Sequence, residues 1–385
     1  MDISLLVGLK NNLPYTQYFY ETTRKLYATI EIVFVSYGST DGTHDWLDQL
    51  SDTHVKYYYS DEHKTLSDTY NKCISLASKK YVAFLHNDMV LSNGFAEKIL
   101  YDLTENRVLF YRVVEPPVFS EDLHKWKLTE DFGSDLQTFR LSAFQKYVAD
   151  IEEQDSEPTE DLFFFLAVSK TVLTHINGLD PIFDPMFRED SDLLYRLQLL
   201  GLDMYQCYNA IAYHFVSKTS RFSEEYLNKT KEIEEKSDRN FYRKWGFGIC
   251  STVKEKRQYG LVLKNADTNA LRLLEPFVSK IYTSSNTDGY VKSEQPFTSI
   301  DVAHKFAKNV AAPEDDILIY FNAKRISSTN LRKFETLSEI IKKKSASPWF
   351  NFKKNLFSKS SFKTGGLKIV IHRFKTYEQE LIIRK

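Results

Sequence analysis

Residues 81–91 read YVAFLHNDMVL, an apolar run interrupted by three polar residues. The run over 81–85 is typical of a strand buried on both faces of a parallel sheet. His86, Asn87 and Asp88 follow it directly, and a carboxylate in such a place is costly unless another group pairs with it. The stretch therefore predicts a buried strand that ends in a capping or functional carboxylate.

Outward from this stretch, apolar runs alternate with helical patterns. Strands are predicted at 3–9, 30–36 and 55–59, and helices at 15–26, 44–50 and 66–78. Such alternation of strands and helices predicts an α/β fold with a mostly parallel central sheet flanked by helices on both faces. Ligands of such sheets bind at the carboxyl ends of the strands, where both Asp88 and the polar turn 36–43 are expected.

The chain over 107–160 is irregular and aromatic. Beyond it, strands are predicted at 162–169 and 204–215, and helices at 193–200 and 223–244. Glu189, Asp190 and Asp192 open the first of these helices, where acidic side chains suit the positive end of the helix dipole.

After Gly248 the pattern changes. Strands are predicted at 259–264, 278–284, 316–321 and 367–372, with helical stretches between the first three. We therefore expect two domains, at 1–248 and 249–385, the second being a smaller α/β module with a Lys- and Phe-rich insertion near 342–366.

Charge is distributed unevenly along the chain. The net charge is -1, but the stretch from Phe321 to Lys385 holds 16 Lys or Arg against 4 Glu and no Asp, a net of +12. The other 320 residues therefore carry -13, which is -1 minus 12. The chain thus has an acidic body and a basic C-terminal part.

Residues 349–363, WFNFKKNLFSKSSFK, interleave aromatic side chains with lysines. Such a segment suits the interface of an anionic bilayer, and it also suits stacking on a single-stranded nucleic acid. A third interpretation is that the segment is a solvated insertion whose aromatic rings pack on the module beneath it.

The three cysteines, Cys73, Cys207 and Cys250, show no paired spacing, which favours a reducing compartment over a disulfide framework or a zinc site. The N-terminus is read as a first strand and not as a signal peptide. No apolar stretch approaches 18 residues, so no membrane span is expected and the cytoplasm is the expected location.

Four features of the sequence suit metal-assisted transfer of a group from a nucleotide. They are the carboxylate at one strand end, the polar turn at another, the acidic cluster about 100 residues further on, and then His214. Divalent Mg or Mn takes one or two carboxylates and leaves its other positions to phosphate oxygens and water. The cation neutralises charge on a leaving diphosphate, and a separate carboxylate deprotonates an incoming hydroxyl.

Five motifs in order resemble one family. They are LLVGLKNNLPYT (5–16), VSYGSTDGT (35–43), HND (86–88), GLDPIFDPMFREDSDLLYRL (178–197) and FYRKWG (241–246). From Ile3 to about Gly246 the chain resembles the family 2 glycosyltransferases, which have the GT-A nucleotide-diphospho-sugar transferase fold and invert the configuration at the sugar carbon.

The resemblance implies a role for each matching residue. Asp88 would hold the metal with His214 beside it, Asp190 would be the general base with Glu189 as the alternative, and Leu9, Lys10, Asn11, Ser36, Tyr37, Asp41, His86 and Asn87 would surround the donor. The sequence departs from the family at two places. Neither Ser36 nor Tyr37 is the usual acid that reads the base or ribose, and His86 replaces the first acid of the metal motif, where it either binds Mn or orients the diphosphate.

Each of these residues also has a purely structural interpretation. Asp88 taken alone is more often a turn former, the acidic cluster is also explained by the helix dipole, and His214 is as readily a core histidine as a site residue. The motif order favours the functional readings.

The sequence thus predicts a hexosyltransferase-type enzyme that uses Mn or Mg, a nucleotide-sugar donor with UDP-sugars foremost, and a glycan or lipid-linked acceptor in surface polysaccharide assembly. Peripheral contact with the inner face of a membrane through 342–366 is expected as an option, and nucleic acid is not expected as a partner. The alternatives are a degenerate binding protein of the same fold and a nucleotidyltransferase, which needs a Gly- and Lys/Arg-rich phosphate loop that residues 10–16 lack.

Overall fold

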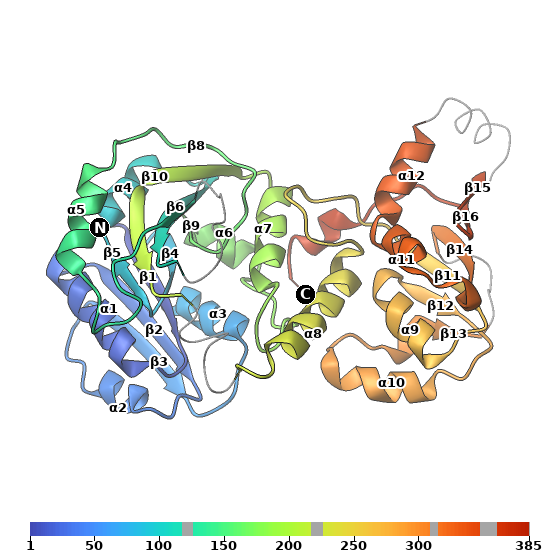
Figure 1. Ribbon diagram of the computed structural model, residues 1–385, viewed down its shortest axis with the longest axis horizontal. Coiled ribbons are helices and arrows are strands. Elements are labelled where there is room, and N and C mark those ends of the chain that lie inside the picture. The colour runs from blue at the N-terminus through green and yellow to red at the C-terminus, as the bar shows by residue number, and fades with distance from the viewer. Residues whose placement is uncertain (118–125, 217–225, 309–314, 347–359, 385) are drawn as a thin grey trace. The chain divides into compact units, whose positions relative to one another are not determined.

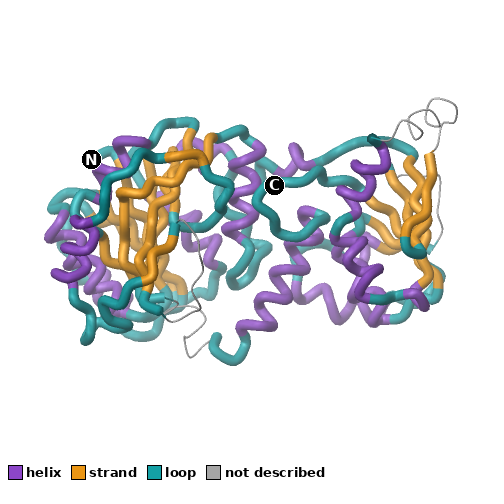
Figure 2. The backbone as a smooth tube through the Cα atoms, turned by 45° about the horizontal axis from the view of Figure 1, so that its top comes forward, coloured by secondary structure: helices purple, strands orange, loops and turns teal. Residues whose placement is uncertain are grey.

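The computed structural model describes residues 1–117, 126–216, 226–308, 315–346 and 360–384. Two compact units are present, Met1–Glu234 with Ile383–Lys385, and Glu235–Ile382 (Figure 1). Figure 2 shows that each unit gathers its strands into a sheet packed against helices. None of the described helices is both long enough and apolar enough to cross a membrane.

The first half of the larger sheet is parallel, in the order β3-β2-β1-β4. Its strands are β1 (Ile3–Leu9), β2 (Glu31–Tyr37), β3 (Val55–Ser60) and β4 (Tyr81–His86). The helices α1 (Leu13–Leu26), α2 (Thr43–Asp48) and α3 (Leu66–Leu76) connect them. The central strands β1, β2 and β4 are apolar on both faces because both faces are covered, as the sequence predicts.

The second half of this sheet is mixed. Its strands are β5 (Met89–Leu91), β6 (Arg107–Glu115), β9 (Leu166–Ser169) and β10 (Asp203–His214), with the short β7 (Lys127–Thr129) and β8 (Glu157–Pro158) at its margins. β9 is antiparallel to β4 and β6, β6 and β10 are parallel, and β5 is antiparallel to β10. The helices of this half are α4 (Phe95–Asp102), α5 (Leu141–Asp150), α6 (Lys170–His175) and α7 (Glu189–Leu199).

The region 107–160 is more regular than its sequence indicates, since it holds β6 and α5. Arg107 and Arg112 interrupt the apolar pattern of β6, so the sequence does not indicate a strand there. Their guanidinium groups lie over the rings of Tyr205 and Tyr208, with 3.8 and 4.3 Å from the Cζ atom to the ring centroid. This stacking accommodates two cations in a strand that pairs over most of its length with β10.

The end of β4 is held from two sides by buried tyrosines. The Tyr70 hydroxyl donates to the Leu85 carbonyl at 2.9 Å, and the Tyr111 hydroxyl donates to the Phe84 carbonyl at 2.6 Å. The Phe215 amide donates to the Asp88 carbonyl at 3.0 Å. The turn that carries Asp88 is therefore fixed between β4 and the end of β10.

The second unit has its own sheet, in the order β13-β12-β11-β14-β16-β15. Its strands are β11 (Tyr259–Lys264), β12 (Lys280–Tyr282), β13 (Phe306–Ala307), β14 (Ile317–Asn322), β15 (Ser360–Thr364) and β16 (Leu367–Ile371). The first four strands in this order are parallel, and β16 is antiparallel to both β14 and β15. The helices are α9 (Thr268–Leu274), α10 (Asp288–Glu294), α11 (Ser328–Glu335) and α12 (Leu337–Ser345), together with most of α8 (Thr230–Trp245).

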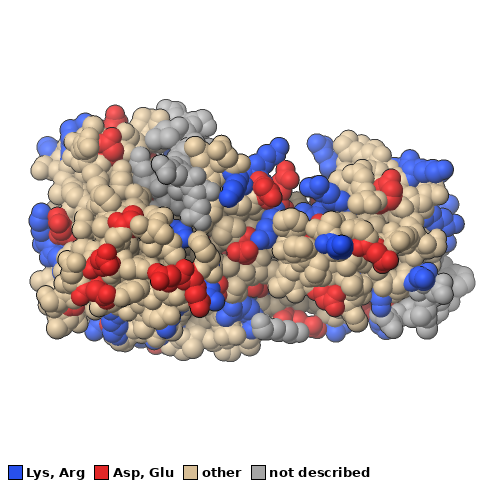
Figure 3. Space-filling model, turned by 90° about the horizontal axis from the view of Figure 1, so that it is seen from below, with Lys and Arg blue, Asp and Glu red and all other residues tan. Residues whose placement is uncertain are grey.

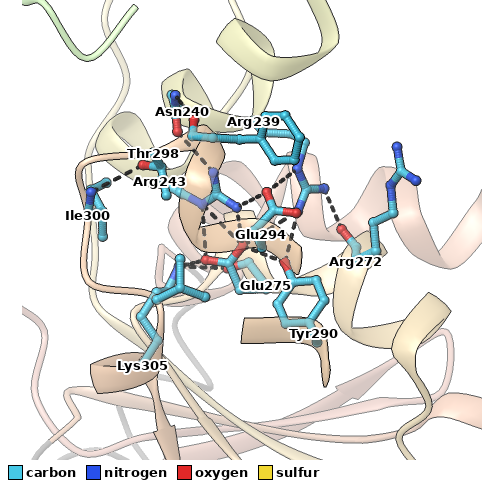
Figure 4. Close-up of polar contacts among 12 residues, drawn as sticks. Arg239, Asn240, Arg243, Arg272, Glu275, Tyr290, Glu294, Thr298, Ile300 and Lys305 are labelled. Carbon is cyan, nitrogen blue, oxygen red and sulfur yellow. Dashed lines mark hydrogen bonds and ion pairs between the residues drawn. The ribbon is translucent and has the colours of Figure 1, made fainter. Parts of the chain in front are cut away.

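The division between the units falls before the expected residue 248, because α8 is bonded to the second unit. Arg243 donates to Glu275 and Glu294, and Lys305 donates to Glu275 from the opposite side (Figure 4). Arg239 adds a hydrogen bond to Glu294 at 2.8 Å. This buried ion-pair network attaches α8 to the elements that follow it in sequence.

Candidate functional site

A pocket of about 350 Å³ opens at the carboxyl ends of the parallel strands of the first unit. Of the residues predicted from the sequence, Leu9, Lys10, Tyr37, His86, Asn87, Asp88 and His214 line it. Asn11, Ser36, Asp41, Glu189 and Asp190 are not among the lining residues. The sheet thus brings residues from four strand ends to one cavity, as expected for this topology.

The floor of the pocket holds a group of three possible ligands, His86, Asp88 and His214. The distance from His214 Nε2 to Asp88 Oδ1 is 3.4 Å, and the distance from His214 Nε2 to His86 Nδ1 is also 3.4 Å. The three donor atoms lie within 4.8 Å of one another. His86 ends β4, His214 ends β10, and Asp88 lies in the turn between β4 and β5.

Glu115, at the end of β6, holds His214 from behind. Its Oε1 lies 2.8 Å from His214 Nδ1, and its Oε2 lies 3.3 Å from Lys127 Nζ. A carboxylate on one ring nitrogen fixes the tautomer and leaves the other nitrogen, Nε2, to face Asp88 and His86. This is the arrangement in which histidines usually bind metals.

The electrostatic field of the site favours a cation. Burial opposes the imidazolium form of His214, but Asp88 and Glu115 outweigh it and raise its pKa to about 9. Burial and the neighbouring His214 lower the pKa of His86 to about 4, so its ring is neutral and keeps a lone pair. Burial opposes ionisation of Glu115 as well, but His214 and Lys127 lower its pKa.

These residues fit a divalent cation. Ligands bound to one cation at about 2.1 Å lie roughly 3–4 Å apart, close to the separations of the three donor atoms. Two imidazole nitrogens and one carboxylate oxygen suit a transition-metal ion better than Mg, which prefers oxygen ligands throughout.

The polar turn after β2 is organised by hydrogen bonds to the segment after β1. Asp41 accepts from the Leu13 amide at 2.7 Å and from the Thr43 hydroxyl at 2.6 Å. Asn11 accepts from the Thr40 amide at 2.7 Å through its side chain. Ser36 is buried and lies 3.0 Å from the His44 ring. These hydrogen bonds join the turn after β2 to the segment that follows β1, whose Lys10 lines the pocket.

Basic side chains lie on this side of the pocket. Lys10 Nζ donates to the Gly38 carbonyl at 2.8 Å, which fixes its ammonium group against the turn. His63 and Lys64, from the loop before α3, line the pocket with it. A pocket with these groups beside a cation site suits a ligand that carries phosphate.

Glu189 and Asp190 open α7, which begins shortly after the pocket-lining Met186. Glu189 is buried, and its Oε2 has no hydrogen-bond partner in the described part of the chain. Burial, and then the charge of Asp190, raises the pKa of Glu189 to about 8. Asp190 is partly exposed and accepts from the Ser191 amide at 2.6 Å. At neutral pH Glu189 therefore holds a proton, and Asp190 is the acid that is open to an incoming group.

Four further residues complete the site or line the pocket and were not predicted from the sequence: Glu115, His63, Lys64 and Tyr226. Like Asp88, Glu115 is a single acid at the end of an apolar strand, which is a pattern that the sequence could have revealed. The two arginines of β6 interrupt the apolar pattern, so the strand is not recognised from the sequence. The other three lie in loops, and no pattern in the sequence marks them.

One family model matches the chain. Residues 4–164 match the model described as glycosyl transferase family 2. This match and the mostly parallel sheet flanked by helices confirm the fold class expected from the sequence, and a second, smaller sheet is present. The match ends before Glu189, Asp190 and His214, so it does not extend to these residues. No curated protein matches the chain.

Solved structures with a similar arrangement include three glycosyltransferase structures of low identity. The mannosyltransferase PcManGT from Pyrobaculum calidifontis, in complex with GDP-Man and Mn2+, is 13% identical with a TM-score of 0.40, over 57% of this chain and 58% of that one. S. aureus TarS 1–349 is 12% identical with a TM-score of 0.42, over 64% and 74%. GalNAc-T7 with UDP, GalNAc and Mn2+ is 11% identical with a TM-score of 0.44, over 63% and 50%. At this level nothing about the substrate of this chain follows from theirs.

Proposed function

We propose that this chain is a metal-dependent, inverting glycosyltransferase of the hexosyltransferase type. The observation that carries the proposal is the His86–Asp88–His214 group, oriented by Glu115, in a pocket at the strand ends. The glycosyl transferase family 2 match over residues 4–164 supports the same reaction class.

The donor is a nucleoside-diphosphate sugar, with UDP-sugars foremost. Lys10, His63 and Lys64 bind the diphosphate from the side of the turns, and Asn87 and His86 approach it from the end of β4. A divalent cation bound by Asp88, His86 and His214 would neutralise the charge that builds up on the leaving diphosphate. Leu9 and Tyr37 line the same pocket and provide apolar and aromatic contacts for the nucleoside.

The transfer is a single displacement at the sugar carbon. The acceptor oxygen forms the new glycosidic bond while the bond from that carbon to the diphosphate oxygen breaks, and Asp190 takes the hydroxyl proton. Glu189 is protonated at neutral pH and is the weaker candidate for this role. Attack on the face opposite the leaving group inverts the configuration.

The acceptor is a glycan or a lipid-linked glycan, in the assembly of surface polysaccharide at the cytoplasmic side of a membrane. In this scheme the N-terminal part to about residue 248 is catalytic, and the C-terminal part is an accessory module. Residues 342–366 are the proposed peripheral contact, of which 347–359 lie outside the described residues.

Thermal unfolding with UDP-, GDP-, CMP- and dTDP-sugars, with and without Mn, tests the proposal. A ligand of the folded state raises the melting temperature by mass action. We expect one nucleotide class to stabilise the wild type only with Mn, no shift in Asp88→Asn, and an unchanged shift in His175→Ala, an exposed histidine in α6. A shift in Asp88→Asn equal to that of the wild type would contradict the proposed site.

A further inference from the structure

The strand order of the second unit places a topological switch between β11 and β14. The neighbours β13-β12-β11 run to one side and β14 lies on the other. In open α/β sheets, binding surfaces lie at the carboxyl ends of the strands at such a switch. Asn265 follows β11 and Asn322 ends β14, and their side chains are joined by a hydrogen bond of 2.9 Å.

Five cationic side chains lie around the end of β14, and we call them the basic edge. They are Lys324, Arg325, Lys333, Lys363 and Lys368. Lys324 and Arg325 follow β14 directly, Lys333 is on α11, and the other two are on the β15–β16 hairpin. All but Lys333 are exposed.

The turn of the β15–β16 hairpin brings these elements together. A Cβ atom added to Gly365 would lie 1.4 Å from Lys333 Nζ, so the ammonium group rests directly on the turn. A Cβ added to Gly366 would lie 3.7 Å from Arg325 Cδ. The glycines thus allow cations from α11 and from the loop after β14 to approach the hairpin.

The basic edge is electrostatically strained in isolation. Lys363 lies directly opposite Lys368 in the β15–β16 ladder, and like charges in such positions repel. The ion pairs of this region use other cations, Lys342, Arg373 and Lys375. Among the described residues, none of the five cations of the basic edge pairs with a carboxylate. An external anion would relieve this repulsion.

We propose that the basic edge docks the second unit onto an anionic lipid surface by contacts with phosphate headgroups. Cations near such a surface each strengthen binding about fivefold, roughly 1 kcal/mol. The sequence leading into β15, residues 349–363, alternates aromatic side chains with lysines, as segments at a bilayer interface do.

A membrane fits better than a nucleic acid. The ring of Tyr320 is partly buried and lies beneath the Lys368 ammonium, 5.4 Å from it, so it offers no platform for stacking of bases. On the face drawn in Figure 3, the first unit shows several acidic side chains close together, and the second unit shows several separate Lys and Arg side chains. Exposed charges that lie more than about 8 Å from a bilayer are largely screened at physiological salt.

Vesicle flotation of the full chain tests the docking surface. The variant Arg325→Gln/Lys363→Gln/Lys368→Gln removes three charges from the basic edge. The matched control Arg272→Gln/Lys292→Gln/Lys308→Gln removes one exposed Arg and two exposed Lys elsewhere in the second unit, for the same change in net charge. We expect wild type and control to bind phosphatidylglycerol-containing vesicles at 0.15 M salt and not phosphatidylcholine vesicles, and the basic-edge variant to bind about a hundredfold more weakly.

Thermal unfolding of each variant checks the fold independently, and removal of the Lys363–Lys368 repulsion should leave the melting temperature equal or slightly raised. Equal weakening in the two triple variants, or binding that ignores lipid charge, would overturn the proposal. Tighter binding to single-stranded oligonucleotide than to vesicles, lost in the basic-edge variant, would also overturn it and assign the surface to nucleic acid. Neither readout depends on glycosyl transfer.

Discussion

At the scale of single residues, the environments of Glu189 and Asp190 separate two acids that are adjacent in sequence. Glu189 is buried with a pKa raised to about 8, and Asp190 is partly exposed. Their order alone does not distinguish the general base, because both lie in the first turn of the same helix. Burial does, since an acid that holds its proton at neutral pH cannot accept another.

Substitution of each acid by its amide distinguishes the two roles. We expect Asp190→Asn to lower kcat by about 10²–10⁴-fold, the usual contribution of a general base, and Glu189→Gln to keep most of the activity. The raised pKa of Glu189 means that wild-type stability falls as pH rises from 4.5 to about 8, because the folded state keeps a proton that the unfolded state loses. The unfolding free energy of Glu189→Gln relative to that of the wild type should therefore be higher at pH 8 than at pH 5. A larger loss of kcat in Glu189→Gln than in Asp190→Asn would reverse the assignment.

The sequence predicts single site residues only where a family motif or a strand end marks them. Asp88, His86 and His214 are found in this way, and the structure brings them together. Glu115 is not predicted from the sequence, because the two arginines of β6 break the apolar pattern of its strand. In the structure it fixes the orientation of His214. Ser36 and Asp41 are marked by the motif but do not line the pocket, and their oxygens form hydrogen bonds within the turn.

At the scale of elements, helix α7 depends on a buried ion pair. Arg196 Nε donates to Asp192 Oδ2 at 2.9 Å, both side chains are fully buried, and Arg196 Nη1 also donates to the Ile176 carbonyl at 3.1 Å. The acidic start of the helix therefore does more than complement the helix dipole. It fixes the helix that carries Asp190.

Breaking this pair should destabilise the first unit. Asp192→Asn leaves the Arg196 charge buried without its carboxylate, which costs about 3–5 kcal/mol in unfolding free energy, and the double variant Asp192→Leu/Arg196→Met should recover most of the loss. Lys146→Met is the control, because Lys146 and Asp150 have the same i,i+4 spacing but are 77% and 63% exposed. That exposed pair is worth about 0.3–0.5 kcal/mol. Similar losses in Asp192→Asn and Lys146→Met, measured by denaturant unfolding, would refute this role.

The elements of the parallel half of the large sheet are predictable because their strands are continuous apolar runs. The sequence places β1, β2, β3 and β4 within a residue or two of their observed ends. It fails where tertiary contacts override the local pattern. Stacking of arginine on tyrosine lets β6 carry two cations, and ion pairs with Glu275 and Glu294 attach α8 to the second unit.

At the scale of the whole molecule, each of the two units depends on buried ion pairs of its own. The second unit buries an ion-pair network in which Glu275 faces Arg243 and Lys305 (Figure 4). Burial opposes the charge of Glu275, but the two cations lower its pKa to about 2. Acidification from pH 4.5 towards 2 therefore removes stability from this unit, because the folded state resists a proton that the unfolded state accepts.

Glu275→Gln should destabilise the second unit by about 3–5 kcal/mol at pH 7, because Arg243 and Lys305 lose their buried carboxylate. The difference from wild type should shrink as pH falls towards 2, where wild-type Glu275 becomes neutral too. Hydrogen exchange of peptides from the second unit, compared between Glu275→Gln and the wild type, measures this difference in unfolding free energy. Glu339→Gln, which removes a half-exposed partner of Lys254, serves as control and should cost at most about 1 kcal/mol. A difference independent of pH would contradict the ion-pair account.

The charge asymmetry of the chain is also a property of the whole molecule. The sequence alone shows a basic end and an acidic remainder, but not which cations share a surface. The structure shows that some of them are paired and that five gather at one sheet edge. The choice of acceptor has no comparable signal, because no motif marks the surfaces that would bind it.

We propose that His86, Asp88 and His214 form one cation site beneath the donor. Electron paramagnetic resonance of free Mn²⁺ at room temperature, titrated with protein and the nucleoside diphosphate that stabilises it, tests this claim directly. We expect one bound Mn per chain in the wild type and in His175→Ala, and at least a tenfold weaker affinity in His214→Ala. Equal Mn affinity in His214→Ala and the wild type would contradict it.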